Sequence, residues 1–171
     1  MKGDFRKLIF TAHIATSIGW AGAVAGFLAL AIAGLTHGDA PIVHVAYPAM
    51  ELISRFVIVP LAFGSLLSGV VQALTTPWGL LRHRWVVVKL IGTILATAVL
   101  LAKMPLIGYA ARRAAEVKLT GADFRMVEMQ LAVHAAGGLL VLLALTTISV
   151  YKPWGLTAYG QRKRRERIGA A

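Results

Sequence analysis

The chain has 171 residues, and 58% of them are apolar, compared with about 45–50% in a soluble domain. This composition indicates a membrane protein. The absence of cysteine excludes disulfides, thiolate metal sites and thiol nucleophiles. A net charge of +11 would suggest nucleic-acid binding in a soluble protein. Here most basic residues flank long apolar runs, so we expect a lipid bilayer as partner and no nucleic acid.

Four apolar runs follow one another along the chain, and a membrane-spanning helix needs about 20 residues. We expect spans over residues 8–35, 49–74, 85–102 and 126–151. The longest connection, 103–125, could hold a short amphipathic helix on the membrane surface. The predicted fold class is therefore all-α, a polytopic membrane four-helix bundle, followed by a basic tail at 152–171.

The first run has an alternative interpretation as a cleaved signal peptide. Lys2, Arg6 and Lys7 precede it, and Ala31-Ile32-Ala33 resembles a small-residue cleavage site. The apolar part of a signal peptide is roughly 7 to 15 residues long. This run is nearly twice that length and contains a histidine and a tryptophan, which favours a retained helix.

Lysine and arginine gather on one side of the predicted bundle, at Lys2, Arg6, Lys7, Arg82, Arg84, Lys152 and the run 162–167. The positive-inside rule makes that side cytoplasmic. We therefore expect a multi-pass protein of the bacterial inner membrane with both termini in the cytoplasm. The connection 103–125 also carries basic residues and fits this orientation less well. The run 162–167 could in addition bind anionic lipid headgroups.

An internal repeat with an offset of 76 residues relates Pro77-Trp78-Gly79-Leu80 to Pro153-Trp154-Gly155-Leu156. The same offset carries His13 onto Lys89. The repeat predicts two helical hairpins related by an axis along the membrane normal, with these two residues at equal depth. Proline and glycine also end helices and tryptophan prefers the interface, so the two segments could have arisen independently.

Small residues at a spacing of four indicate close helix packing. Gly22 and Gly26 form one such step, and Ser65 and Gly69 form another. The Gly22/Gly26 face could hold the bundle together, or could join it to a second copy or to another membrane protein. Pro60 lies within the second run and should kink that helix.

Ionisable side chains inside the spans suggest function, because a charge in lipid costs several kcal/mol. His13 and Lys89 lie roughly 6 to 8 Å inside the cytoplasmic ends of their runs. A second layer, nearer the opposite end, contains Glu51, Arg55, Glu128 and His134.

Simpler explanations exist for most of these groups. A histidine such as His13 can be satisfied by a hydrogen bond inside the bundle. Lys89 could extend to the interface. Glu51 and Arg55 are four residues apart and could neutralise each other.

Three stretches share a pattern with a known family: His13, Trp20 and Ala21-Gly22; Met50-Glu51, Arg55, Ile58 and Pro60; and Trp85 with Lys89-Leu90. Together they cover about residues 8–100. In these positions the chain resembles the four-helix J-type protoporphyrinogen oxidases and the related copper-resistance D membrane proteins. Three further stretches, 76–79, 134–138 and 151–153, resemble a group of bacterial integral membrane proteins that has no assigned activity.

The resemblance to the oxidases implies that His13 binds haem b and that Lys89 is needed for catalysis. The chain departs from the oxidase pattern at the end of the third run, where Leu100-Leu101-Ala102-Lys103 replaces a further histidine. It has His134 in the fourth run instead, a second candidate ligand for haem or metal. His13 and His134 could not easily share one iron, because their depths differ by roughly 12 Å.

The leading hypothesis is a haem b-binding membrane protein, either an electron carrier or a haem-dependent oxidoreductase. His13 would be the axial ligand beneath Trp20, and Arg55 would pair with a propionate. A second hypothesis is a metal-handling or transport protein with a site of Glu51, Glu128 and His134. His13 is a further candidate metal ligand. A third is an accessory subunit of a membrane complex that binds neither haem nor metal.

Overall fold

The computed structural model describes residues 2–37, 40–76, 78–116 and 122–169. Its elements in chain order are α1 (Lys2–His37), α2 (Ala40–Ile53), the π-helical turn η1 (Ser54–Ile58), α3 (Val59–Thr75), α4 (Arg84–Ala115), α5 (Ala122–Tyr151) and α6 (Ala158–Gly169). Four stretches are long and apolar enough to cross a membrane: Gly3–Thr36, Pro41–Thr75, Arg84–Ala115 and Phe124–Tyr151. The predicted all-α four-helix membrane bundle is confirmed.

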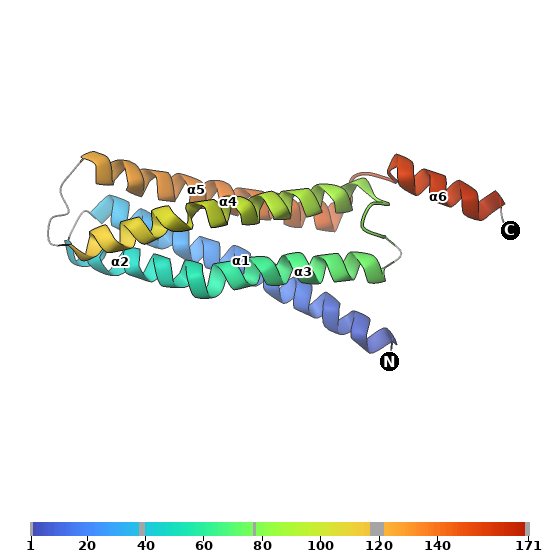
Figure 1. The fold of residues 1–171 in the computed structure, drawn as a ribbon, viewed down its shortest axis with the longest axis horizontal. Coiled ribbons are helices and arrows are strands. Elements are labelled where there is room, and N and C mark those ends of the chain that lie inside the picture. Colours follow the sequence, from blue (N-terminus) through green and yellow to red (C-terminus); the bar gives the residue numbers. More distant parts are fainter. Residues whose placement is uncertain (1, 38–39, 77, 117–121, 170–171) are drawn as a thin grey trace.

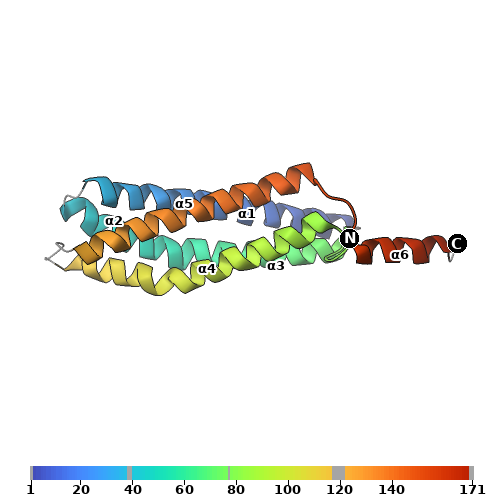
Figure 2. The ribbon, with the colours of Figure 1, turned by 90° about the horizontal axis from the view of Figure 1, so that it is seen from above.

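The four long segments run antiparallel to their neighbours in an elongated bundle (Figures 1 and 2). The continuous segment α2–η1–α3 packs against both α1 and α4, and α5 also packs against α1 and α4. Both termini lie at the same end of the bundle, where α6 projects beyond it along the long axis (Figure 1). The N-terminal part of α1 diverges from α5 at this end.

The second membrane-spanning segment begins at Ala40 rather than near residue 49. Residues 41–48 contain two prolines, but Pro41 stands in the first turn, where its missing N–H leaves no helical hydrogen bond unmade. The segment between them is apolar except for His44, and it buries Val43 and Tyr47 against the rest of the bundle. Packing of this face therefore outweighs the cost of Pro48 inside the helix.

Pro60 changes the form of the same helix rather than ending it. Proline cannot donate to the carbonyl four residues earlier, and its ring crowds that carbonyl. The chain responds with the π-helical turn η1, in which the Val59 N–H donates to the Ser54 carbonyl five residues before it. The perturbation predicted at Pro60 is thus a local widening of the helix immediately before that residue.

The third membrane-spanning segment continues to Ala115 instead of ending near residue 102. Residues beyond Lys103 are again apolar, and they bury Ile107, Ala110 and Ala114. The amphipathic surface helix considered for 103–125 is absent from its described part, because residues 103–115 extend α4 and residues 122–125 already belong to α5. Residues 117–121 lie outside the described part of the chain.

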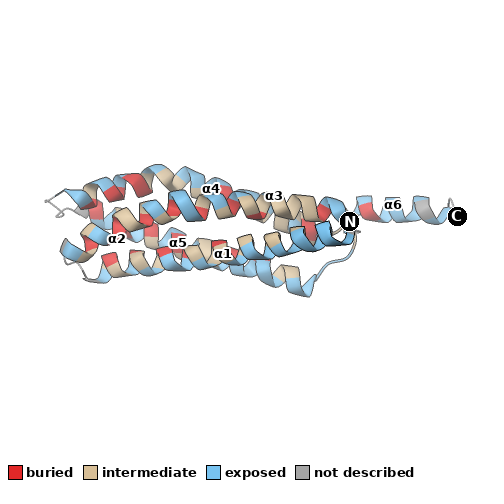
Figure 3. Cartoon of the chain, turned by 90° about the horizontal axis from the view of Figure 1, so that it is seen from below, coloured by how far each residue is buried: buried red, intermediate tan, exposed pale blue. Residues whose placement is uncertain are grey.

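Burial divides the bundle into two halves. We call described residues 3–19, 63–93 and 143–157 the terminal half, and described residues 20–62 and 94–142 the distal half. Every member of the hydrophobic core cluster belongs to the distal half, from Trp20 on α1 to Leu142 on α5. None of residues 3–19 is buried, and exposed residues dominate this part of α1 (Figure 3). The protein therefore has a packed end and an open end.

The glycines that bring helices together are not the pair expected from spacing. A Cβ on Gly22 or Gly26 would meet no described atom within 4 Å, so this face does not hold the bundle together. A Cβ on Gly34 would instead lie 2.9 Å from the Tyr47 ring, and one on Gly69 would lie 2.9 Å from the His13 ring. Gly34 therefore permits close packing against Tyr47, and Gly69 permits it against the candidate site residue His13.

Candidate functional site

A cavity of about 530 Å³ occupies the interior of the terminal half. All four membrane-spanning segments contribute to it, together with the connection before α4 and Lys152 after α5. Ligand sites for small molecules and cofactors typically measure about 300–1,000 Å³ and combine apolar walls with a few polar groups. The wall residues include Trp20, Trp78 and Trp85, so the cavity has both the size and the apolar lining of a ligand site.

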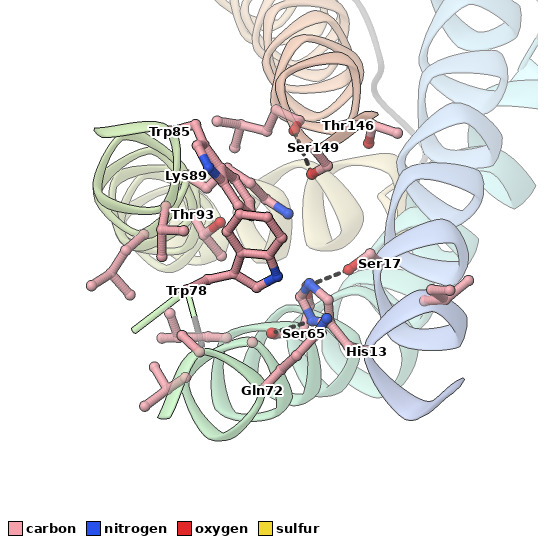
Figure 4. Close-up of a pocket in the computed structure, with 18 of the residues that line it drawn as sticks. His13, Ser17, Ser65, Gln72, Trp78, Trp85, Lys89, Thr93, Thr146 and Ser149 are labelled. Atoms are coloured by element: carbon pink, nitrogen blue, oxygen red, sulfur yellow. Dashed lines mark hydrogen bonds between the residues drawn. The ribbon is translucent and has the colours of Figure 1, made fainter. Parts of the chain in front are cut away.

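His13 projects into this cavity from α1 (Figure 4). Its Nδ1 lies 3.1 Å from the backbone carbonyl oxygen of Ser65 and 3.1 Å from Ser68 Oγ. A carbonyl oxygen only accepts, so Nδ1 carries the proton and Nε2 of the neutral ring keeps a free lone pair. Metal-binding histidines commonly use this arrangement, in which the second nitrogen donates to a carbonyl and fixes the ring.

Ser68 and Ser17 strengthen the contact between α1 and α3 around this histidine. The Ser68 hydroxyl donates to the Gly64 carbonyl at 2.6 Å, which orients its oxygen as an acceptor for the imidazole. One helical turn after His13, Ser17 Oγ lies 2.8 Å from Ser65 Oγ. Two hydrogen-bonded contacts thus fix α1 against α3 and hold the imidazole in a defined orientation.

Lys89 lines the same cavity from α4, so the structure brings His13 and Lys89 together. Among the described residues, no carboxylate or hydrogen-bond acceptor pairs with the Lys89 ammonium. An unpaired cation that faces the interior of a membrane bundle indicates a functional site.

An aromatic cluster with one lysine lines the cavity at the end that holds the termini. The Trp78 and Trp85 rings meet edge to face with centroids 5.7 Å apart. Lys152 Nζ lies 4.9 Å from the Trp78 centroid and 5.8 Å from the Trp85 centroid, within the range of cation–π attraction. The two repeat-related turns meet here, since the Arg84 N–H donates to the Gly155 carbonyl.

Arg55 and Glu51 lie outside the cavity. They form an ion pair with an N–O distance of 3.4 Å on the second membrane-spanning segment, as their spacing allowed. The Arg55 side chain is 63% exposed and belongs to the distal half, so it does not accompany His13. A cation for an acidic ligand group is instead available from Lys89 or Lys152.

Glu128 is buried in the distal half. The Tyr47 hydroxyl donates to its Oε1 at 3.1 Å, and Arg125 lies 3.9 Å from its Oε2. Arg125 also donates to the Leu35 carbonyl at 2.8 Å. This network joins α1, α2 and α5, and it satisfies the Glu128 carboxylate from within the chain.

His134 is on an exposed face of α5, and its Nδ1 lies 2.7 Å from the carbonyl oxygen of Gln130 on the same helix. The structure does not bring it to Glu51, Glu128 or His13. No group of three or more histidine, aspartate or glutamate side chains suitable for a metal ion occurs within the described ranges. The Glu/His metal site proposed from sequence is not assembled in this fold.

Several contributors to the site were not predicted as site residues from the sequence, chiefly Ser17, Ser65, Ser68 and Lys152. Trp85 was noted there only as part of the pattern shared with the oxidases. A signal for part of this set was present. Ser65 and Ser68 are spaced by three residues within an apolar run, and Ser17 follows His13 by four, as helix faces require. The approach of Lys152 to the cavity had no comparable signal, because it depends on how the two turns meet.

Comparison of the chain with protein-family models, with curated proteins and with solved structures finds no match.

Proposed function

We propose that this chain is an integral membrane protein that binds haem b in the cavity of the terminal half, with Nε2 of His13 as an axial ligand. The observation that carries the proposal is the His13 imidazole, whose Nδ1 is committed to the Ser65 carbonyl on the wall of a cavity of about 530 Å³. An imidazole oriented in this way is ready to coordinate iron without rearrangement.

The other cavity residues fit the same cofactor. Haem has a broad apolar face and two acidic propionates. The tryptophans supply apolar walls, while Lys89 and Lys152 supply cations for acidic groups. Arg55, the propionate partner expected from sequence, is replaced in this role by Lys89. The pattern shared with J-type protoporphyrinogen oxidases points to the same cofactor and to the same pair, His13 and Lys89.

Bound haem would supply one-electron redox chemistry, and the chain would supply position and surroundings. Ser65 and Ser68 hold the imidazole, and Trp78 and Trp85 supply apolar surface at the bundle end of the cavity. Lys89 places a positive charge where an acidic group or a transferred proton could be held. If the protein is an enzyme, Lys89 is the catalytic candidate in a haem-dependent membrane oxidoreductase.

The proposal includes an orientation in the bacterial inner membrane. The terminal half faces the cytoplasm, because Arg82, Lys152 and the exposed basic residues of α6 lie at this end. The haem would then lie near the cytoplasmic surface of the bilayer. Reporter fusions to the C-terminus and to the connection around residue 38 would give opposite compartments if this is correct.

Titration of the purified apoprotein with haem b tests the proposal. We expect a saturable Soret band for the wild type, a band that is lost or shifted in His13→Ala, and an unchanged band in His134→Ala. The second variant is a matched control, because it removes a histidine that lies outside the cavity. The absence of a saturable band in the wild type, or equal spectra for all three proteins, would refute haem ligation by His13.

A further inference from the structure

The cavity opens sideways between α1 and α5. Phe10, Ile14 and Ile18 follow one another at a spacing of four on α1, and all three line the cavity while being 52%, 40% and 65% exposed. On α5, Val150 also lines the cavity and is 71% exposed. Side chains that border an internal space and the outside at once mark the rim of an opening.

The rim of this opening is apolar and lies on two membrane-spanning segments. The two segments are Gly3–Thr36 and Phe124–Tyr151, which are long and apolar enough to span the bilayer. At the end of the bundle, by contrast, Trp78, Trp85 and Lys152 pack together across the cavity. The route from lipid is therefore apolar, whereas the bundle end, where Trp78 lines the cavity and is 41% exposed, presents aromatic rings and a lysine.

The terminal half of α1 is attached to α3 but not to α5. The hydrogen bonds of His13 and Ser17 that reach another helix are made to residues of α3. Within the described residues, no hydrogen bond or ion pair joins 3–19 of α1 to α5. The opening between these helices is thus not closed by polar contacts that a ligand would have to break.

The charges inside the cavity select an acidic ligand. Its described lining residues include Lys89, Lys152 and His13 but neither aspartate nor glutamate. A ligand that travels through lipid and then meets two lysines needs an apolar body and an acidic group.

We infer that the cavity takes an acidic amphiphile directly from the lipid phase, through the opening lined by Phe10, Ile14 and Ile18 on α1 and Val150 on α5. This inference rests on the cavity being the ligand site of the proposed function, and haem b is one acidic amphiphile that fits it. The inference adds to the proposed function the route by which the ligand enters and the chemical class of the ligand. It therefore also applies to other acidic amphiphiles dissolved in the membrane.

The test uses 9,10-dibromostearate, a brominated acidic amphiphile that quenches tryptophan, and the protein in lipid vesicles. Trp154 is exposed and lies outside the cavity lining, so Trp154→Phe removes a background signal. In that background, Ile18→Cys is labelled with a bulky methanethiosulfonate. The label reacts only at position 18, because the wild-type chain has no cysteine. The matched control is Ile32→Cys, an exposed position on the same helix outside the cavity lining.

We expect saturable quenching in the unlabelled proteins, with a rate that falls at least tenfold when Cys is labelled at position 18. Removal of the label with a reductant should restore the rate, and the label at position 32 should have no effect. The methyl ester of the same brominated acid should bind at least tenfold more weakly than the acid, and Lys89→Gln should abolish this difference. Quenching that is unsaturable, or equally fast with both labels, would overturn the inference.

A parallel measurement separates the lateral opening from haem binding. It follows the growth of the Soret band after the same labelled proteins are mixed with haem-loaded vesicles. Saturable quenching that depends on position 18, without a Soret band, would retain the lateral opening and refute haem binding. A Soret band that develops equally fast with both labels would retain haem binding and refute the lateral opening.

Discussion

The two halves of this bundle use the same helices in different ways. In the distal half, large side chains such as Tyr47, Met50 and Leu131 fill the interior, and the buried Glu128 is satisfied by Tyr47. In the terminal half, the same four segments separate around a cavity that contains His13 and an unpaired Lys89. The buried Glu128 carboxylate of the distal half thus has partners within the chain, whereas the Lys89 side chain of the terminal half faces the cavity without a partner among the described residues. The difference indicates that the distal half provides most of the packing that stabilises the fold, and it agrees with our proposal that the terminal half holds a ligand.

The largest expected effect on stability comes from a leucine in the distal half. Leu131 is 2% exposed within the core cluster, so Leu131→Ala should lower the free energy of unfolding by about 2–5 kcal/mol. Leu90→Ala is the matched control, because Leu90 borders the cavity and loses fewer contacts. Unfolding in mixed micelles, with a rising fraction of denaturing detergent, measures both. Equal losses of unfolding free energy in the two variants would contradict the distinction between a packed distal half and an open terminal half.

A somewhat smaller effect is expected at the buried carboxylate of the distal half. Tyr47→Phe removes the hydroxyl that donates to Glu128 and leaves a buried acceptor short of one partner. The free energy of unfolding should fall by about 1–3 kcal/mol. Tyr159→Phe serves as the control, since Tyr159 is exposed on α6 and should change nothing measurable. If the two variants unfold alike in the same assay, the network does not stabilise the fold.

Gly69→Ala should affect ligand binding more than folding. The added methyl group would lie 2.9 Å from His13 Cε1, so the imidazole must move on the cavity wall. Changes that disturb the orientation of a metal-binding histidine typically weaken binding about 10–100-fold, and we expect haem affinity to fall by this factor. Gly22→Ala, where a Cβ meets nothing within 4 Å, should leave the affinity unchanged. Spectral titration distinguishes the two.

The smallest change in the free energy of unfolding of the single chain is expected at Gly26. Its face packs against no described part of the chain, so Gly26→Leu should change the free energy of unfolding by less than about 0.5 kcal/mol. If this face joins two copies, as the glycine spacing predicts, the same variant should convert the wild-type dimer to a monomer. Sedimentation in density-matched detergent measures the mass. A monomeric wild type would exclude that interface.

The sequence predicted the membrane class and four-helix bundle, because long apolar runs leave few alternatives in lipid. It also selected His13, Lys89 and Trp20, three residues that line the cavity. Helix bounds at Ala40 and Ala115 were missed, since prolines and Lys103 suggested ends that tertiary packing overrides. Arg55 was chosen as the propionate partner although its position along the chain already put it in the opposite layer from His13, and in the structure it lies outside the cavity.

The most direct test of the central claim is ¹⁵N NMR of histidine-labelled protein titrated with zinc protoporphyrin, a diamagnetic porphyrin whose metal accepts one axial ligand. The structure predicts that the Nε2 resonance of His13 shifts on binding while its Nδ1 remains protonated, with assignment from His13→Gln. Binding that leaves the His13 resonances unchanged, or that shifts those of His134 instead, would contradict the claim that His13 faces a ligand-binding cavity.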